Sequence, residues 1–528
     1  MTYQNPILPG FYPDPSVCRV GEDYYLVTSS FEYFPGVPLF HSKDLVHWEQ
    51  IGHCLTRRSQ LEIVDGYPSV SGIFAPTLRH HNGRFYMITT NKMLGKRPGN
   101  PGNFFVWTDD IRSEWSDPVW IDHKGIDPDL FFDDDGKVYY TGAVQGIWQC
   151  EIDINTGERL TESQLIWKGT GGASAEGPHL YKIGGVYYLL IAEGGTSFGH
   201  MVTMARSDFP SGPFEPCPRN PLLTHRSIKS PIQAVGHADM VQAHDGSWWA
   251  VCHGIRPVEY PSVHHLGRET LLAPVTWADD GWPVLGNGGM LSLDMDADGL
   301  PSVVVPEKPT RDDFDAAALD MRWNFIRNPH EGDWSLTEHP GSLTLRGSER
   351  TLETGGSPAF VGRRLQHFCC DIRTRLEFDP QNDGEEAGLT AFLNGAMTSV
   401  GGGGHHYEIA VAKVDGRKVV LFRRRVGTLW MIDRMDGFNG GAVTLGVETA
   451  HRHFRFYYVT DDGQQITVGT GETHYLAAEV GGGFTGLYVG LYATGNGKRS
   501  ETPAYFDWFD YTLMEDTGAE SYWGYIKC

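Results

Sequence analysis

A glycine followed closely by two aromatic residues recurs five times in the first three hundred residues of this chain. Successive pairs begin 61, 54, 48 and 61 residues apart, in apolar segments separated by hairpin turns such as Asp-Asp-Gly. The first aromatic residues of the pairs are Tyr24, Phe85, Tyr139, Tyr187 and Trp248. A period of about fifty residues without helical periodicity is typical of a four-stranded propeller blade. Five units therefore predict a five-bladed β-propeller over residues 1–305.

A second region follows a proline-punctuated stretch at about 300–315, LPSVVVPEKPTRDDFD, which we interpret as a linker. Beyond it, alternating segments such as SLTLRG and HFRFYYV are separated by glycine-rich or Asp-Gly turns. This pattern predicts an antiparallel β-sandwich of the jelly-roll or lectin-like kind over residues 310–515, with a tail at 516–528. The whole chain is therefore predicted to be all-β.

Charge and composition exclude several classes of partner. The chain has 43 basic and 66 acidic residues, a net charge of −23, so it would repel phosphate backbones and anionic lipid surfaces. Its eight cysteines show no disulfide framework and no paired metal-knuckle spacing, and its first residues do not resemble an export signal. No apolar run is long enough to span a membrane. We predict a cytosolic protein that binds neither nucleic acid nor membranes.

The phase within each repeat points to a site. Ten to twelve residues before each aromatic pair stand Asp14, Phe74, Asp127, Glu176 and His237, in similar contexts that enter a strand. In a propeller the first strand of each blade runs along the central axis, so equivalent phases should meet around one mouth of the channel. Three of the five residues are acids, and crowding carboxyl groups is unfavourable unless they serve a function.

Glycoside hydrolysis needs two acids on either side of a scissile acetal, one to protonate the leaving oxygen and one to activate water or attack. The three phased acids predict such a site, in which the third tunes the other two. Aromatic side chains are available as sugar-stacking walls: Phe31, Phe34, Phe74 and Trp148. Asp129, Asp239 and Glu269 are candidates for supporting positions behind the three acids.

These residues lie in motifs that together resemble glycoside hydrolase family 43, specifically its β-xylosidase group with a C-terminal β-sandwich. The resemblance covers essentially the whole chain and is carried by NPILPGFYPDPS, IFAPTLR, GIDPDLFFDDDGK, AEGPHLYK, GHADMVQ, GRETLLAPVTW, RWNFIRNP and YFDWFDY. It implies inversion of configuration, with Asp14 as general base, Glu176 as general acid, and Asp127 orienting the acid and adjusting its pKa. It also implies that Arg268 holds hydroxyl groups of the terminal sugar.

The resemblance further implies that His237 lies at the channel centre, where some relatives hold a divalent ion through water. We expect no required cofactor, with calcium as the candidate ion near His237. A sandwich loop is expected to close the pocket, and we assign this lid to residues 494–503. The resemblance also implies a homo-oligomer.

The leading function is exo-cleavage of xylose from the non-reducing end of β-1,4-xylo-oligosaccharides. The alternatives are α-L-arabinofuranosidase activity, alone or as a side activity, a non-catalytic carbohydrate-binding propeller, and a protein-binding scaffold. Phe74 stands where tryptophan is common in the family, and a proline- and glycine-rich insertion covers about 92–105. Both departures leave open which sugar the protein prefers, but they do not change the predicted reaction.

Overall fold

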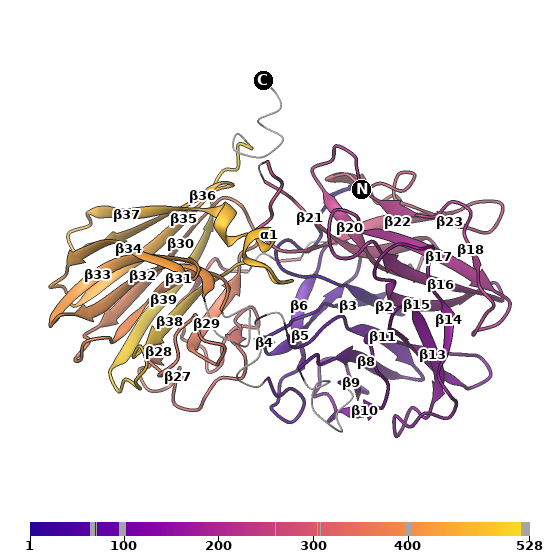
Figure 1. The fold of residues 1–528 in the computed structure, drawn as a ribbon, viewed down its shortest axis with the longest axis horizontal. Helices are drawn as coiled ribbons and strands as arrows, with labels where there is room; N and C mark the ends of the chain where they lie inside the picture. The colour runs from indigo at the N-terminus through magenta and orange to yellow at the C-terminus, as the bar shows by residue number, and fades with distance from the viewer. Residues whose placement is uncertain are drawn as a thin grey trace.

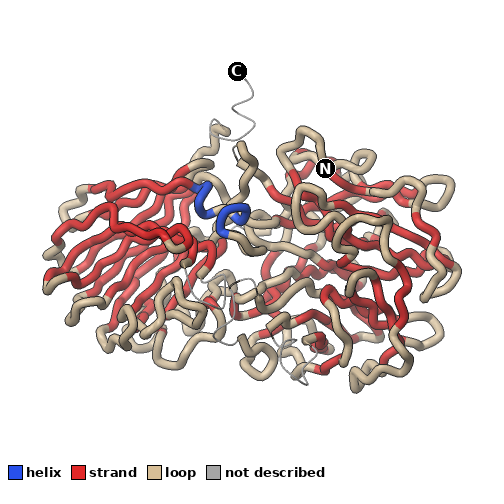
Figure 2. Tube along the Cα trace, in the orientation of Figure 1, coloured by secondary structure: helices blue, strands red, loops and turns tan. Residues whose placement is uncertain are grey.

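The chain folds into two β-rich bodies that lie side by side (Figure 1). The structure is a computed structural model that describes residues 1–63, 69, 71–93, 102–258, 260–303, 305–306, 308–395 and 403–518. Within these ranges the helical segments are a 3₁₀ turn at Thr473–Leu476 and α1 at Ala478–Gly481. Both lie where the two bodies meet (Figure 2). The predicted all-β class is confirmed.

Five antiparallel sheets form the blades of the propeller. In chain order they are β2 (Ser16–Val20), β3 (Asp23–Val27), β5 (Gly36–Ser42) and β6 (Glu49–Leu55); β7 (Thr77–His81), β8 (Arg84–Thr90), β9 (Asn103–Thr108) and β10 (Val119–Ile121); β11 (Ile126–Phe132), β12 (Val138–Ala143), β13 (Ile147–Ile152) and β14 (Gln164–Trp167); β15 (Glu176–Ile183), β16 (Val186–Glu193), β17 (Met201–Ser207) and β18 (Glu215–Pro216), with β19 (Leu223–Thr224) beside β17; and β20 (Gln233–Gln242), β21 (Trp248–Ile255), β22 (Glu269–Trp277) and β23 (Pro283–Leu285). Each aromatic pair of the repeat lies on the second strand of a blade. The phased residues lie in the first strand of each blade or just before it: Asp14 and Phe74 precede β2 and β7, Asp127 and Glu176 are at the start of β11 and β15, and His237 is in the middle of β20.

The N-terminal segment is fixed to the last blade. β1 (Thr2–Gln4) pairs antiparallel with β24 (Asp294–Asp296), which follows that blade. The side-chain amide of Asn5 donates a hydrogen bond to the carbonyl of Leu272 in β22, at 3.1 Å. These contacts place the segment that leads to Asp14 against the fifth blade.

The second body is a sandwich of two antiparallel sheets. One contains β25 (Arg311–Asp312), β27 (Trp334–Ser335), β28 (Leu343–Arg346), β39 (Pro503–Leu513), β30 (Cys370–Phe378), β35 (Ala442–Thr449), β36 (His453–Val459) and β37 (Gln465–Glu472). The other contains β29 (Ala359–Arg364), β38 (Tyr488–Thr494), β31 (Glu386–Asn394), β32 (Gly404–Val414), β33 (Arg417–Gly427) and β34 (Leu429–Gly437). In β30 buried residues alternate with more exposed ones, so one face of the strand packs in the core.

The propeller and the sandwich share a packed boundary. β4 (Tyr33–Phe34) of the propeller side pairs with β26 (Phe325–Ile326) of the sandwich side. The rings of Tyr33 and Tyr488 stack with centroids 3.8 Å apart, and the guanidinium of Arg364 donates to the carbonyl of Phe11 at 2.7 Å. This boundary lies directly behind the mouth of the propeller, because Phe31 and Tyr33 belong to the same buried cluster.

Two further sequence predictions concern the surroundings of the protein. No helix among the described residues is long and apolar enough to cross a membrane. The seven cysteines that lie in the described ranges form no disulfide. The boundaries at 305, 310 and 515 stay predictions, and residues 519–528 of the predicted tail lie outside the described residues.

Candidate active site

One pocket at the mouth of the propeller brings the phased residues together. All five phased residues line it. Its lining residues are Asp14, Phe31, Phe74, Ala75, Ile126, Asp127, Glu176, Thr196, His237, Arg268 and Phe484. The set includes the three predicted acids together with Arg268, His237, Phe31 and Phe74, and it is contributed by all five blades and by one loop of the sandwich.

The backbone turns sharply where the phased residues stand. Asp14, Asp127 and His237 adopt left-handed conformations with φ of 55°, 52° and 52°. The pairing of the first strand with the second shifts register at these positions in the third and fifth blades, and after Glu176 in the fourth. A β-bulge of this kind re-aims side chains at the end of a strand. Repetition of the bulge turns three blades' side chains toward one pocket.

Gly177 allows the fourth and fifth blades to approach each other. Its φ is +56°, and a Cβ added there would lie 2.9 Å from the ring of His237. Its backbone N–H donates a hydrogen bond of 3.2 Å to Oδ2 of Asp127. A side chain at this position would displace His237, so glycine is needed for the acids and the histidine to share the pocket.

Asp14 is held as a buried carboxylate. Its side chain accepts a hydrogen bond from the hydroxyl of Ser29, at 2.5 Å, and another from the guanidinium of Arg268. Its backbone N–H donates to Nδ1 of His253 at 3.1 Å. Burial by itself would raise the pKa of Asp14, but Arg268 and His253 outweigh it and hold this pKa well below its ordinary value. Asp14 is therefore ionised near neutral pH.

Glu176 has the opposite electrostatic environment. Burial is the main cause that raises its pKa to about 7, and the neighbouring charge of Asp127 adds to it, while His237 opposes the shift. Near neutral pH a large fraction of Glu176 therefore carries a proton. One pocket thus holds an acid that can donate a proton beside an acid that stays ionised.

His237 lies between these carboxyl groups. Its Nε2 is 3.6 Å from Oδ2 of Asp127. Burial would lower its pKa, but the contact with Asp127 and the charges of Asp14 and Glu176 raise it to about 9. Calcium prefers oxygen ligands to imidazole nitrogen, so a calcium ion near His237 would contact it through water.

Aromatic rings form the apolar wall of the pocket. Phe31 and Phe74 have ring centroids 5.1 Å apart, and Phe484 stacks on Phe31 at 5.9 Å. The guanidinium of Arg268 lies 5.7 Å from the centroid of Phe31 and 5.9 Å from that of Phe484. A ring wall facing a charged fork and carboxyl groups suits a sugar, which has apolar faces and hydroxyl edges.

The sandwich contributes Phe484, but through a different loop from the one that we predicted. Gly486 comes close to the propeller backbone, since a Cβ added there would lie 2.3 Å from the carbonyl oxygen of Leu266. The predicted lid at 494–503 contacts another part of the sandwich. The side-chain amide of Asn496 donates a hydrogen bond to the carbonyl of Gly384 at 2.7 Å. The lid prediction was therefore wrong, because which loop faces the partner domain depends on how the two domains dock.

The supporting acids hold the blades together. Arg79 lies 2.9 Å from Asp129 and 2.9 Å from Asp239, which joins the second, third and fifth blades. Asp239 also accepts a hydrogen bond from the hydroxyl of Ser16, at 2.6 Å. Glu269, the neighbour of Arg268, accepts a hydrogen bond from the backbone of Gly10 at 2.8 Å. None of these three acids is among the described residues that line the pocket.

Some predicted residues lie elsewhere, and some pocket residues were not predicted. Phe34 packs at the domain boundary, and the indole N–H of Trp148 donates a hydrogen bond to the carbonyl of Val144. Neither side chain lines the pocket. Sequence reasoning missed Ser29, His253, Thr196 and Phe484, which are outside the repeat phase. Residues 94–101 of the predicted insertion lie outside the described residues.

Family models match both parts of the chain. The model described as "Glycosyl hydrolases family 43" matches residues 3–283. The model described as "Beta xylosidase C-terminal Concanavalin A-like domain" matches residues 311–512.

Relatives match the chain over nearly its whole length. A protein of Bacteroides ovatus named non-reducing end alpha-L-arabinofuranosidase is 43% identical, with 97% of this chain and 95% of the relative covered. A xylosidase/arabinosidase of Butyrivibrio fibrisolvens is 40% identical, covering 97% and 99%. The solved structure of a xylan beta-1,4-xylosidase from Bacillus halodurans has a TM-score of 0.90 and 34% identity, covering 97% of this chain and all of that one.

Proposed function

This chain belongs to glycosyl hydrolase family 43, and we propose that it removes xylose from the non-reducing ends of β-1,4-xylo-oligosaccharides with inversion of configuration. The observation that carries the proposal is the contrast between two carboxyl groups in one pocket. Arg268 and His253 keep Asp14 ionised, whereas burial and Asp127 keep a proton on Glu176 near neutral pH. Inverting hydrolysis needs this pair of protonation states.

In the proposed mechanism, Asp14 removes a proton from a water molecule that attacks the anomeric carbon. Glu176 donates its proton to the departing glycosidic oxygen, so the leaving group departs as an alcohol. Asp127 raises the pKa of Glu176 through its charge. Arg268, which already contacts Asp14, holds hydroxyl groups of the sugar. Phe31, Phe74 and Phe484 pack on the apolar face of the sugar.

The small pocket supports exo-cleavage. Phe484 of the sandwich and Phe31 and Phe74 of the propeller form one side of the pocket, and this wall suits one terminal sugar better than a continuous chain. The names of several relatives support xylosides as substrates. Calcium, if it binds near His237, takes no part in these steps.

α-L-Arabinofuranosidase activity is the second candidate function. It is favoured by the name of the 43% identical relative from Bacteroides ovatus. Xylopyranose and arabinofuranose can present similar hydroxyl groups to one pocket, and Phe74 is a departure at a residue that lines it. Membership in a family of glycosidases leaves no support for the non-catalytic and scaffold alternatives.

The test is to follow hydrolysis of aryl β-xyloside and xylobiose by proton NMR and to measure the anomer that is released first. We expect α-xylose, which mutarotates later. Release of β-xylose would contradict inversion. The ratio of kcat/KM on aryl β-xyloside to that on aryl α-L-arabinofuranoside then decides between the two substrates.

We also propose that the chain forms a homo-oligomer through β34, the edge strand of the six-stranded sheet. Leu429, Trp430 and Met431 on this strand are 75%, 57% and 52% exposed. A second copy added antiparallel along this edge would cover these apolar side chains across a two-fold axis. We expect Trp430→Asp to lower the mass measured by light scattering, and Tyr260→Asp, at a residue 84% exposed elsewhere, to leave it unchanged.

A cytosolic location remains our proposal. It is supported by the lack of disulfides among the described cysteines and by the choice of short, importable oligosaccharides as substrates. Fractionation of the native cells would test it.

A further inference from the structure

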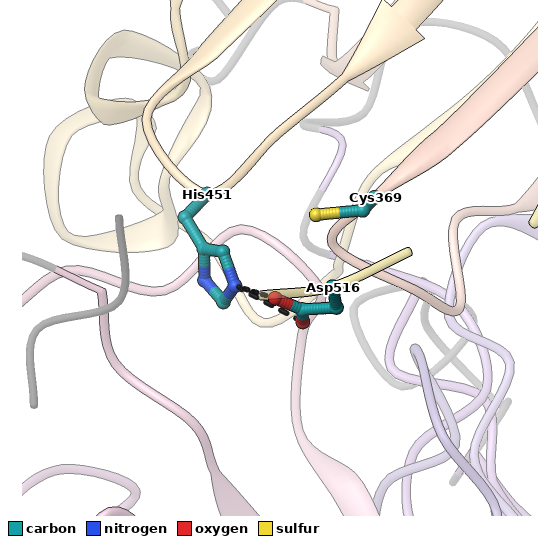
Figure 3. A group of neighbouring side chains, drawn as sticks. All are labelled: Cys369, His451 and Asp516. Carbon is teal, nitrogen blue, oxygen red and sulfur yellow. Dashed lines mark hydrogen bonds and ion pairs between the residues drawn. The ribbon is translucent and has the colours of Figure 1, made fainter. Parts of the chain in front are cut away.

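Three side chains of the sandwich that can ligate metals converge outside the pocket. Cys369, His451 and Asp516 each offer one ligand atom, and these atoms all lie within 4.8 Å of one another. Figure 3 shows the sulfur, the imidazole and the carboxylate pointing toward one another. Nε2 of His451 lies 3.0 Å and 3.1 Å from the two carboxylate oxygens of Asp516.

The topology of the eight-stranded sheet explains why these residues meet. β39, β30 and β35 are neighbours in this sheet, and β30 runs antiparallel to both. Cys370, the first residue of β30, is paired with Leu513 at the end of β39 and with Thr449 at the end of β35. The residues just beyond these strand ends come from three segments that are distant in sequence. They therefore lie together at one end of the sheet.

Local contacts fix the three groups in place. The ring of Phe368 stacks on that of His451, with centroids 4.2 Å apart and an angle of 26°. The hydroxyl of Thr473 donates to the carbonyl of His451 at 2.8 Å. The backbone N–H of Met514 donates to the carbonyl of Cys369 at 3.0 Å, which brings the segment that carries Asp516 back to the sheet. The cluster is therefore preorganised rather than a chance meeting of mobile side chains.

The arrangement does not suit a nucleophilic triad. In such a triad the carboxylate and the thiol contact opposite nitrogens of the imidazole. Here Nε2 faces Asp516, and Figure 3 shows the sulfur of Cys369 on the same side of the ring. Convergence of three different donors on one point is the geometry of a metal centre.

The donor set selects the class of metal. Thiolate and imidazole are the ligands of zinc and other borderline or soft divalent ions, whereas calcium and magnesium prefer oxygen ligands alone. A thiolate and a carboxylate together balance the charge of a divalent ion. Three protein ligands complete a tetrahedron with one water molecule.

We propose that Cys369, His451 and Asp516 form a zinc site, which fastens the segment after β39 to the sandwich. The site lies near the domain boundary, because the guanidinium of Arg256 from the propeller side lies 4.9 Å from the centroid of the Phe368 ring, against which His451 stacks. Binding of zinc to the folded chain therefore stabilises it in proportion to the zinc concentration. The thiol must lose its proton, so affinity falls as pH is lowered.

The test uses the full chain without an affinity tag, treated with a chelator and then titrated with Co²⁺ and Zn²⁺. We expect one equivalent of Co²⁺ to produce a thiolate-to-cobalt charge-transfer band in the near ultraviolet. Zn²⁺ should abolish the band by competition and raise the melting temperature, and Ca²⁺ should do neither. A calcium ion near His237 would therefore not be mistaken for this site.

Variants assign the ligands. Cys369→Ser should remove the band, and Asp516→Asn, at an exposed side chain that does not threaten folding, should weaken binding about 100-fold. His453→Gln and Glu515→Gln are neighbouring controls that should bind as the parent does. Cys528→Ser controls for the thiol at the end of the chain.

The proposal is overturned if Co²⁺ gives no thiolate band, if Asp516→Asn binds as tightly as the parent, or if Cys528→Ser rather than Cys369→Ser removes the band. If Cys369→Ser fails to fold, the proposal can still be overturned. The Asp516→Asn titration and the competition by Zn²⁺ each test it without that variant.

Discussion

The propeller and the sandwich each bury a cluster of carboxyl groups with one arginine and with histidine nearby, yet the two clusters differ in how the arginine is shared. In the sandwich, Arg423 donates to both Glu386 and Glu408. Burial would raise the pKa of Glu408, but Arg423 and His406 lower it to about 2. Both acids contact the guanidinium of Arg423, and Glu408 is ionised near neutral pH.

In the propeller, Arg268 contacts Asp14 but forms no hydrogen bond or ion pair with Glu176 among the described contacts. The pKa of Glu176 rises to about 7, because burial and Asp127 act on it without a guanidinium in contact. The same residue types thus give a structural ion network in one domain and a split pair of protonation states in the other. Which acid the arginine touches decides the difference.

The largest expected effect separates the two clusters by turnover. Glu176→Gln removes the proton donor, so kcat on xylobiose should fall about 10²–10⁴-fold. Glu408→Gln in the sandwich cluster is the matched control, and its folded fraction should keep the parent's kcat. Initial rates corrected for folded protein measure both. Near-parent hydrolysis of xylobiose by Glu176→Gln would end the assignment of the acid.

The second prediction separates them by stability. Arg423→Met strands two buried carboxylates, so the free energy of unfolding should fall by about 3–5 kcal/mol. Arg434→Met, at a side chain that is 43% exposed, should change it by less than about 1 kcal/mol. Urea titrations of the sandwich signal measure both. Equal effects of the two substitutions would contradict a buried network.

A third prediction concerns the loss of folding stability that the raised pKa of Glu176 causes. Its pKa is 4.5 ordinarily and about 7 in the fold, so between these values the unfolded chain loses a proton that the folded chain keeps. The contribution of Glu176 to the stability of the parent therefore decreases as pH rises from about 4.5 to 7. Glu176→Gln should be more stable than the parent by about 1–3 kcal/mol at pH 8. The gain should disappear below pH 4, and a gain that is independent of pH would contradict this cause.

The smallest expected effect is a shift of the pH profile. Because Glu176 must be protonated, kcat/KM should fall as pH rises through about 7. Asp127→Asn removes a negative charge that raises this pKa, so the alkaline limb should move to lower pH. Asp134→Asn, in a turn where the side chain is 85% exposed, should leave the limb in place. Rates of both variants across the pH range measure the shift, and an unmoved limb in Asp127→Asn would contradict the coupling.

Much of the candidate site could be predicted from sequence because its residues obey a local rule. The aromatic pair sets the second strand of each blade, and chain connectivity then fixes where the first strand begins. Asp14, Asp127, Glu176 and His237 follow from this phase. The bulges and left-handed φ values that aim them into the pocket were not predicted, since they depend on pairing between strands.

Residues that reach the site from outside the repeat could not be predicted in the same way. Ser29 reaches Asp14 within the first blade, whereas His253 and Phe484 reach the site only after blades and domains pack. The predicted lid at 494–503 lies elsewhere on the sandwich, and the contact with the pocket belongs to the loop with Phe484. Docking between domains depends on the shapes of two surfaces, and the amino-acid sequence does not reveal the shape of either one.

The sequence by itself determined the number of blades, the all-β class and the positions of the acids, because strand periodicity and repeat phase are properties of neighbouring residues. Only the tertiary structure decided which acid receives Arg268, which loop carries Phe484 to the pocket, and which strand ends bring Cys369, His451 and Asp516 together. These are distances between segments remote along the chain, and they set the charges on which the proposed chemistry depends.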